Sequence, residues 1–487
     1  MRDRAESAGR TGSADWNDGA DLAGESSRCG GEREGGGERG PLLLFANFVS
    51  DVVCGREPAE LNLHGMVQSS RKVWLARPGD VLVAQFPVSR EFRRYVGGLL
   101  GMAPESVAVI TTEPDPTLPL AEAVEQTPGL TGRLRALVAE RPGIELLPIV
   151  LDRSTVRLAA ELGVPVSGYG NRHPGSGGSG PEAVPESALE AVDRLNTKSG
   201  FREAAQKLHI RVPAGRACRD WPDVVAGARE LLDRYRQVLV KPARAAGGDG
   251  LRIVTRADLP NLAQHQDALR NQPEGWVVEE YVPFVRDVSV QMEVGPTGAT
   301  VVYCGEMRTR DCSYHGFASP LPEQERERAG SGGHGGGAGV HRELESAGLA
   351  LGGHLTECGY RGRFSIDAGV TEDSAVYAVE SNVRRTATST RHALARRLAA
   401  MSGRPDRAWL ADTRPGPHAT DLTAVQTLLQ ETELAYSHQR GEGVVLSVES
   451  LVPDTGWHYA AIAADLGRAA ELERSLHALL DAALGSD

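Results

Sequence analysis

Three polar residues at the ends of two neighbouring predicted strands could bind a divalent cation. Asp367 lies within one strand, Glu380 and Asn382 end the next, and a short turn joins the two. Residues two apart on a strand point to the same side, so this hairpin can bring the three side chains together. Their oxygen atoms suit Mg²⁺, which completes its coordination with water and phosphate. A hairpin with solvated polar side chains is the alternative, although Asp and Asn are poor strand residues.

Lys241 and the glycines that follow it could bind phosphate. The lysine closes an apolar strand and precedes a turn that contains Gly247, Gly248 and Gly250. Glycine lets backbone N–H groups approach phosphate oxygens, and a lysine at a strand end adds a positive charge. A plain connection between two strands is the alternative. The order also differs from that of a P-loop, in which the lysine follows the glycines and a helix comes next.

A further lysine and a group of acids complete the local candidates. Only four of the 53 basic residues are lysines, at positions 72, 198, 207 and 241, and a compact ammonium fits sites that a planar guanidinium does not. Lys198 starts a predicted helix, where a cation opposes the helix dipole; a solvated surface lysine is the alternative. Glu279 and Glu280 end an apolar strand and point to opposite sides, so one of them faces inward. Adenine could bind the backbone there, with Asp287 on the ribose.

The elements that must position these residues follow two patterns. From Leu42 to about residue 170, apolar strands near 80–86, 106–111 and 144–151 alternate with helical segments, which predicts an open α/β sheet. From residue 186 onward the chain changes to helices and paired strands. Segments 287–294 and 299–307 are predicted to pair around a Gly-Pro-Thr-Gly turn, and 210–213 is predicted to be a strand.

The predicted division of the chain has four parts. They are a disordered tail (1–40), an α/β domain ending in a linker (41–185), a two-lobed domain (186–402, with lobes 186–278 and 279–402) and a C-terminal α/β module (403–487).

The composition excludes several classes of protein. At 487 residues, with 40% hydrophobic and 24% charged residues, the chain should form a soluble globular protein of more than one domain. A net charge of −12 argues against sequence-independent nucleic-acid binding, and the lack of an apolar run of about 18 residues argues against a membrane span. Six scattered cysteines without a C-x-x-C motif indicate reduced thiols. We therefore expect a cytoplasmic protein with no nucleic-acid or membrane partner.

Taken in chain order, these motifs resemble the ATP-grasp superfamily. The order is a lysine before a helix, VLVKP with a glycine loop, VVEEYV with a following acid, and then D…E-x-N-x-R. The resemblance spans roughly residues 42–400. It implies an α/β (α+β) ATP-grasp fold with an N-terminal open α/β pre-ATP-grasp domain, a two-subdomain clamp around ATP and a small C-terminal module. The implied activity is carboxylate–amine ligation, in which ATP activates a carboxylate as an acyl phosphate before an amine attacks.

The resemblance also implies roles for single residues. Lys198 and Lys241 would contact the α- and β-phosphates, and the loop 245–250 would close over the β- and γ-phosphates. Residues that would hold adenine and ribose are Glu279, Glu280, Val282 and Asp287. Ligands of one or two Mg²⁺ ions, or of Mn²⁺, would be Asp367, Glu380 and Asn382. Arg384 would stabilise the acyl phosphate and the tetrahedral intermediate, with Lys241 and Arg310 as further catalytic candidates. Candidate substrate residues are Arg308, Arg310, Ser313, Arg363 and Arg385.

A narrower resemblance concerns the substrates. The segments LLLFANFVSDVVCGR, GRFSIDAGV and VESNVRR and the C-terminal module are similar to the pheganomycin-type peptide ligases, which join an unusual amino acid to a ribosomally made peptide. This implies an amino acid or derivative as the acid and an amino acid or peptide as the amine, in natural-product biosynthesis; similar ligases are frequently homodimers. An ATP-grasp kinase acting on a hydroxyl and a non-catalytic ATP-binding regulatory protein are the alternatives. Loops 245–250 and 321–342 are both candidate lids over the acyl phosphate.

Overall fold

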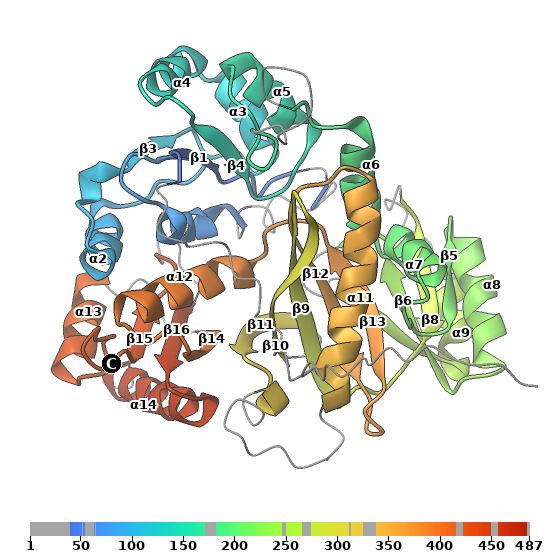
Figure 1. Cartoon of the computed structure of the whole chain (residues 1–487). Coiled ribbons are helices and arrows are strands. Elements are labelled where there is room, and N and C mark those ends of the chain that lie inside the picture. Colours follow the sequence, from blue (N-terminus) through green and yellow to red (C-terminus); the bar gives the residue numbers. More distant parts are fainter. Residues whose placement is uncertain are drawn as a thin grey trace, which may run out of the picture.

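A computed structural model describes most of the chain. The described residues are 39–50, 52–53, 63, 65–170, 182–245, 250–264, 274–310, 313–324, 338–414, 422–449 and 456–484. Nearly all of the predicted N-terminal tail, Gly247 and Gly248 of the phosphate loop, and much of the loop 321–342 therefore lie outside the described residues. The fold contains three sheets, which Figure 1 shows at the top, the right and the centre of the molecule.

The N-terminal sheet is parallel, as the alternation of strands and helices predicted. Its strand order is β3-β2-β1-β4, and its strands are β1 (Leu42–Phe45), β2 (Val81–Ala84), β3 (Ala108–Thr111) and β4 (Glu145–Pro148). Helices α3 (Leu120–Gln126), α4 (Leu130–Ala139) and α5 (Arg153–Leu162) lie on one side, while α2 (Arg90–Leu100) and the 3₁₀ helix η1 (Gln68–Leu75) lie on the other. Strands covered on both faces are apolar throughout, which explains the short continuous runs in this half of the sequence.

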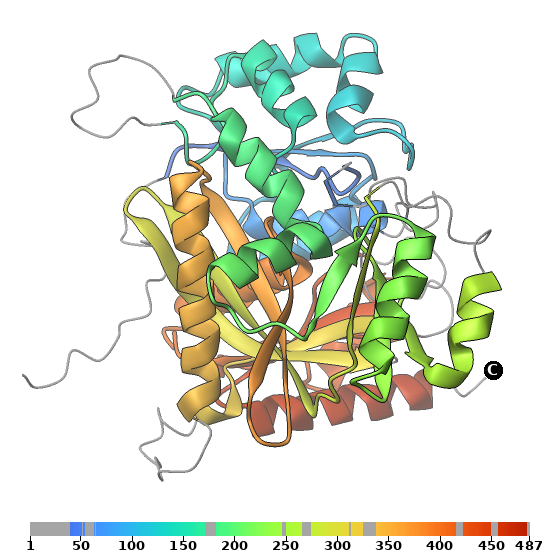
Figure 2. The ribbon, with the colours of Figure 1, turned by 90° about the vertical axis from the view of Figure 1, so that its right-hand side faces the viewer.

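The second sheet is antiparallel and small. Its order is β5-β8-β6-β7, and its strands are β5 (Gly215–Cys218), β8 (Trp276–Glu280), β6 (Gln237–Pro242) and β7 (Arg252–Thr255). Helices α8 (Trp221–Leu232) and α9 (Leu259–Gln264) share its apolar core. The strand predicted at 210–213 is wrong, because that segment is irregular and pairing begins at Gly215. Figure 2 shows α6 (Glu186–Leu195) and α7 (Lys198–Lys207) between this sheet and the N-terminal domain.

The third sheet has eight antiparallel strands and runs through the centre of the molecule. Its order is β13-β12-β9-β10-β11-β14-β16-β15. The first five, in chain order, are β9 (Arg286–Gly295), β10 (Gly298–Arg310), β11 (Ser313–Ser319), β12 (Gly362–Val370) and β13 (Val376–Asn382). The last three are β14 (Ala408–Arg414), β15 (Gly443–Leu446) and β16 (Trp457–Ala463). The predicted turn between β9 and β10 is confirmed: Gly295 pairs with Gly298, whose φ of +118° requires glycine.

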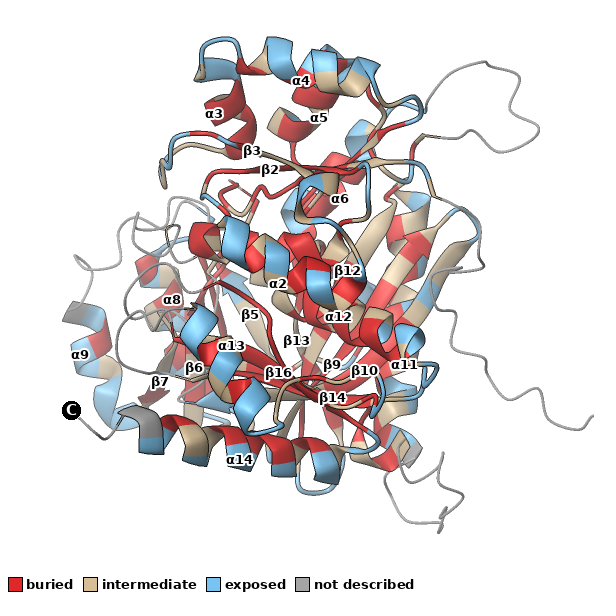
Figure 3. Ribbon diagram, turned by 90° about the vertical axis from the view of Figure 1, so that its left-hand side faces the viewer, coloured by how far each residue is buried: buried red, intermediate tan, exposed pale blue. Residues whose placement is uncertain are grey.

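Helices cover both faces of this sheet. They are α11 (Ala338–Glu357), α12 (Ala387–Met401), α13 (Leu422–Glu431) and α14 (Leu466–Leu484). In Figure 3, α14 shows buried residues along one side and exposed residues along the other, as expected for a helix that packs on a sheet. No helix among the described residues is both long and apolar enough to cross a bilayer.

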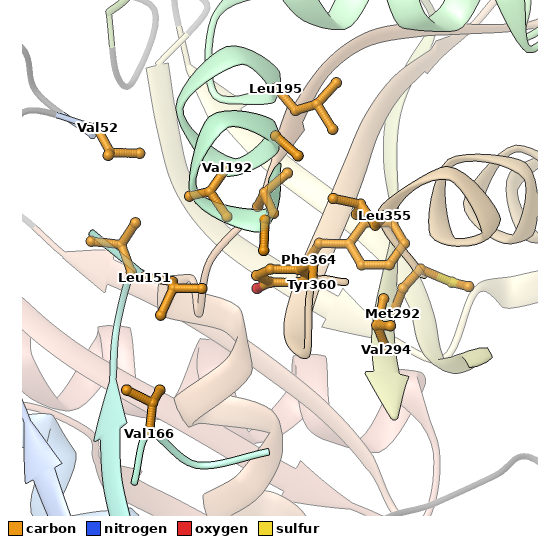
Figure 4. Packing of buried hydrophobic residues seen from close by; sticks show 14 of the residues in the cluster. Val52, Leu151, Val166, Val192, Leu195, Met292, Val294, Leu355, Tyr360 and Phe364 are labelled. Carbon is orange, nitrogen blue, oxygen red and sulfur yellow. The ribbon is translucent and has the colours of Figure 1, made fainter. Parts of the chain in front are cut away.

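One apolar cluster joins the domains. Figure 4 shows Leu151 and Val166 of the N-terminal domain, Leu195 of α6, and Met292 and Phe364 of the central sheet within the same buried cluster. Side chains in such a continuous core are closely packed, so the elements around it keep a fixed arrangement. The residues described next lie on this frame.

Candidate active site

Strands β9 and β12 carry an apolar face and a polar face. On β9, Val288, Val290 and Met292 belong to the buried core that includes residues of α11. The residues between them are polar, and they include the buried Ser289 and Gln291. Because successive strand residues point to opposite sides, α11 covers the apolar face while the polar residues face the other side of the sheet.

The predicted cation ligands come together on this polar face. Asp367 on β12 pairs in register with Glu380 on β13 and with Ser289 on β9, which gives a row of polar residues across three strands. Ser289 Oγ donates to Asp367 Oδ1 at 2.7 Å, and Asn382 Nδ2 donates to Asp367 Oδ2 at 2.9 Å. We call Asp367, Glu380 and Asn382 the acidic row.

The electrostatics of the acidic row fit a divalent cation. Burial, and then the nearby charge of Glu380, raises the pKa of Asp367 to about 7. Two carboxylates this close repel each other unless a proton or a cation lies between them. Among the described residues no group of three His, Cys, Asp or Glu side chains forms a metal cluster. Two carboxylates and one amide oxygen suit a hard cation such as Mg²⁺, which retains water and phosphate ligands.

Arg384 lies directly beside the acidic row. Its Nη1 donates to Asn382 Oδ1 and, at 3.1 Å, to Asn196 Oδ1. Asn196 also accepts the backbone N–H of Val383 at 3.1 Å, so it supports the segment that carries the arginine. A guanidinium held in this way can stabilise negative charge that develops near the cation.

Lys198 connects the second sheet to the acidic row. Thr197 caps α7, the backbone N–H of Lys198 donates to Ala243 O at 2.7 Å, and Lys198 Nζ donates to Ala245 O at 2.9 Å. Lys198 Nζ also lies 3.5 Å from Glu380 Oε2. Burial lowers the pKa of Lys198, against the opposing effect of the Glu380 carboxylate. The predicted surface alternative for Lys198 does not fit these contacts.

Lys241 has a buried partner that the sequence did not indicate. Its Nζ lies 2.5 Å from Glu279 Oε1, and Arg202 Nη1 donates to Glu279 Oε2 at 3.0 Å. The Lys241 and Glu279 side chains are 6% and 4% exposed. The carboxylate of Glu279 therefore orients the lysine, and adenine contacts at this residue would use its backbone.

The other predicted nucleotide residues lie near the end of β8 in the second sheet and the start of β9 in the central sheet. Ala214 N–H donates to Glu280 Oε1 at 2.8 Å, and Thr309 Oγ1 donates to Asp287 Oδ2 at 2.6 Å. Val282 follows β8 and is half-buried. Gly250 has a φ of +70°, and a Cβ there would lie 2.8 Å from Pro242 Cγ, so the loop after Lys241 requires glycine at this end.

The predicted substrate residues are spread over three places. Arg308 Nη1 lies 2.5 Å from Glu473 Oε1 and 2.8 Å from Asp412 Oδ2, and Arg310 Nη2 lies 3.5 Å from Asp412 Oδ2. These acids belong to α14 and β14. Residues placed elsewhere are Arg363, which lies 3.4 Å from Glu293, Ser313 at the start of β11, and Arg385, which lines a cavity in the N-terminal domain.

We predict that Arg308 holds the C-terminal strands and helix in place. Replacing Arg308 or Glu473 with Ala should lower the free energy of unfolding by about 1–2 kcal/mol, because a partly buried ion pair is broken. The double replacement should cost clearly less than the sum of the single ones, which denaturant titration of all four proteins would measure. If Arg308→Ala instead leaves stability unchanged and raises the KM of a substrate, the substrate role stands.

Sequence reasoning missed the residues that support the acidic row. Ser289 and Gln291 are 0% and 5% exposed, and Gln291 Nε2 donates to Ser289 Oγ at 2.9 Å. The available signal was the strict polar–apolar alternation of 287–294, DVSVQMEV, which places Ser289 and Gln291 on the same face as Asp287. Asn196 had no comparable signal.

Comparisons with known sequences match two regions of the chain and one curated relative. Residues 69–164 match the model of the pre ATP-grasp domain, and residues 424–476 match that of the PGM1 C-terminal domain. The chain is 26% identical over 367 residues to the L-propargylglycine--L-glutamate ligase of Streptantibioticus cattleyicolor, a match that covers 68% of this chain and 69% of that protein.

Comparisons with solved structures give the same fold. The N5-carboxyaminoimidazole ribonucleotide synthetase of Thermus thermophilus has a TM-score of 0.53 at 14% identity, covering 90% of this chain and 98% of that one. The biotin carboxylase domain of the Hydrogenobacter thermophilus 2-oxoglutarate carboxylase, solved with MgADP, ADP and bicarbonate, has a TM-score of 0.51 at 14% identity, covering 90% of both chains. The matched domain, the sequence relative and the shared fold together support an ATP-grasp carboxylate–amine ligase.

Proposed function

We propose that this ATP-grasp ligase joins the carboxylate of one amino acid to the amine of another amino acid or of a peptide. The observation that carries the proposal is the acidic row with two cationic neighbours: Arg384 donates to Asn382, and Lys198 Nζ lies 3.5 Å from Glu380 Oε2. A kinase needs the nucleotide residues, but an arginine at the cation site additionally suits an acyl phosphate and the tetrahedral intermediate. A non-catalytic ATP-binding protein would not require both the cation ligands and this arginine.

The charged residues of the site support a two-step reaction. ATP would bind between the second sheet and the central sheet, with Lys198 and Lys241 on its phosphates. The substrate carboxylate attacks the γ-phosphorus, the bond to the β-phosphate oxygen breaks, and ADP leaves. The amine then attacks the acyl carbon, a proton is lost, and phosphate departs as the amide forms. Positioning and charge neutralisation are what phosphoryl transfer chiefly requires, and no covalent enzyme intermediate is needed.

The acidic row would hold the cation that ATP brings. Mg²⁺ bound by Asp367, Glu380 and Asn382 would neutralise phosphate charge. Asn382 Oδ1 accepts from Arg384 and, as a carbonyl oxygen, has a second lone pair for a cation. Ser289 orients Asp367, while Asn196 and Asn382 hold Arg384 beside the reacting oxygens.

Two similarities support small amino-acid substrates in natural-product biosynthesis. The name of the sequence relative describes the joining of propargylglycine to glutamate. Residues 424–476, which match the PGM1 C-terminal domain, belong to the C-terminal module that resembles the peptide ligases. We therefore propose a free amino acid as the acid and glutamate, another amino acid or a short peptide as the amine.

Measuring ADP and phosphate release tests the proposal. The protein is incubated with Mg-ATP and a panel of amino acids and short peptides, singly and in pairs, and products are identified by mass. We expect release that requires both an acid and an amine, with one amide formed per ADP. The matched controls are Glu380→Ala, which should lose the activity, and Glu372→Ala, which removes an exposed acid in the turn of the same hairpin and should retain it.

Other products would decide against the proposal. A phosphorylated hydroxyl would establish the kinase. Tight ATP binding without turnover across the panel, combined with unchanged ATP affinity in Glu380→Ala, would favour the regulatory protein.

A further inference from the structure

Three buried cationic side chains lie together next to the acidic row. Arg71 and Lys72 belong to η1 and Arg391 to α12, and these residues are 7%, 3% and 3% exposed. Helices η1 and α12 pack against each other. Burial, and then the nearby charge of Arg391, lowers the pKa of Arg71 to about 9. Burial, followed by the charges of Arg71 and Arg385, also lowers the pKa of Lys72.

None of the three cations has a carboxylate partner within the described parts of the chain. Arg71 Nη1 donates to Gln68 at 2.5 Å, its guanidinium lies 4.7 Å from the centre of the Phe48 ring, and its Nε has no partner. Lys72 Nζ lies 5.8 Å from the same ring. Arg391 donates to the hydroxyl of Tyr314 at 3.2 Å and otherwise contacts Thr413 and His458.

Such a cluster is unfavourable without an anion. Buried charges in proteins are normally paired, because removing an ion from water is unfavourable. Rings, hydroxyls and amides compensate only part of that cost. An oxyanion placed among Arg71, Lys72 and Arg391 would supply the missing partner and accept several charge-assisted hydrogen bonds.

The location of the cluster also indicates a ligand. Lys72 and Arg385 line a small cavity, whose other walls include the carboxyl ends of β1 and β4. Ligands of open parallel sheets bind beyond the carboxyl ends of the strands. Arg385 N–H donates to Ile149 O at 2.8 Å, and the preceding residue is Arg384 of the acidic row. Arg384 and Arg385 are consecutive, so the cavity lies one residue along the chain from the arginine of the acidic row.

We propose that Arg71, Lys72 and Arg391, with Arg385 at the cavity wall, bind a substrate carboxylate that does not react. This inference rests on the proposed ligase function. The reacting carboxylate must lie at the acidic row and ends as a neutral amide, whereas a second carboxylate keeps its charge throughout turnover and matches a permanent cationic site. That carboxylate belongs either to the acid or to the amine substrate.

Calorimetric titration tests the site without turnover. L-Glutamate, its side-chain amide L-glutamine and its α-amide L-isoglutamine are titrated into the protein loaded with Mg²⁺ and a non-hydrolysable ATP analogue. We expect Lys72→Met and Arg71→Met to weaken glutamate binding about tenfold or more, as loss of a charge-assisted hydrogen bond does. Each amide lacks one of the two carboxylates of glutamate. The carboxylate that the cluster recognises is the one whose amide binds the wild-type protein as weakly as glutamate binds Lys72→Met. Lys207→Met, which removes an exposed lysine, should bind like wild type.

Thermal unfolding distinguishes recognition from a structural role. Without ligand, Lys72→Met should raise Tm, because it removes a buried cation that has no carboxylate partner in the described part of the chain. Glutamate should then raise the Tm of wild type more than that of the variant. If Lys72→Met does not fold, Arg391→Met carries the same test.

The outcomes separate this site from the ligase proposal. If the cluster variants bind glutamate more weakly than wild type but no assay detects an amide, the carboxylate site is supported and the ligase proposal is not. In an active enzyme, the substrate whose KM rises in Lys72→Met, acid or amine, is the one that the cluster binds. Equal affinities of wild type, Lys72→Met and Arg391→Met for glutamate, or a lowered Tm with unchanged affinity, would overturn the inference.

Discussion

Replacing Asp367 with Asn is expected to lower kcat about a thousandfold or more, because transition-state charge at the phosphates loses a cation ligand. Asparagine has nearly the same shape as aspartate, so the protein should fold. The metal-free variant should even be at least as stable as wild type, since burial and Glu380 disfavour the charged form of Asp367. Steady-state kinetics and thermal unfolding with and without Mg²⁺ measure both effects.

The same residue determines a pH dependence. Its pKa of about 7 in the folded protein lies above the ordinary value of a carboxyl group. The folded protein without metal therefore binds more protons than the unfolded chain between about pH 4 and pH 7, and this contribution lowers stability as the pH rises through that window. Mg²⁺ requires the deprotonated form, so its affinity should increase up to and just above pH 7. An Mg²⁺ affinity that is independent of pH between about 6 and 8, or an Asp367→Asn variant with normal kcat, would contradict this assignment.

Replacing Lys241 with Met is expected to have two separable effects. The KM for ATP should rise about tenfold or more, because a phosphate contact is lost. The free energy of unfolding should fall by roughly 3 kcal/mol, because the buried Glu279 loses one of its two cationic partners. ATP-dependent kinetics and denaturant titration measure the two effects independently.

A second replacement separates nucleotide binding from stability. In Lys241→Met/Glu279→Gln the buried charge is removed, so most of the lost stability should return while the KM for ATP stays high. Lys207→Met is the matched control and should change neither quantity. Recovery of the ATP KM in the double variant would show that Lys241 acts only through the structure around Glu279.

Local sequence patterns correctly predicted the features that depend on residues close together in the chain, such as the acidic row. The two-residue spacing of Glu380 and Asn382, and the turn before them, were sufficient to place both on one face opposite Asp367, because strand alternation leaves little freedom. The rarity of lysine was also informative: Lys72 and Lys241 are buried and Lys198 nearly so, whereas Lys207 is exposed.

Long-range pairings could not be predicted in this way. Arg308 and Glu473 are separated by 165 residues, and nothing in either segment indicates that they meet. The partner of Lys241 is another example, since Glu279 reaches it only because β6 and β8 are neighbours in the second sheet. The cation cluster of η1 and α12 likewise depends on how the N-terminal domain packs against the central sheet.

The pairing of β11 with β14 has a consequence for how the protein avoids self-association. If the chain ended after α12, β11 would be the last strand of its sheet and would present unpaired backbone N–H and C=O groups to other molecules, which is a common starting point for aggregation. The C-terminal strands move that boundary outward to β15, which is only four residues long. At the opposite end, the N–H of Ala378 on β13 donates to Arg211 O at 2.8 Å, so this margin is also partly covered. The C-terminal region thus completes a sheet whose two edge strands leave few backbone groups for pairing with a strand of another molecule.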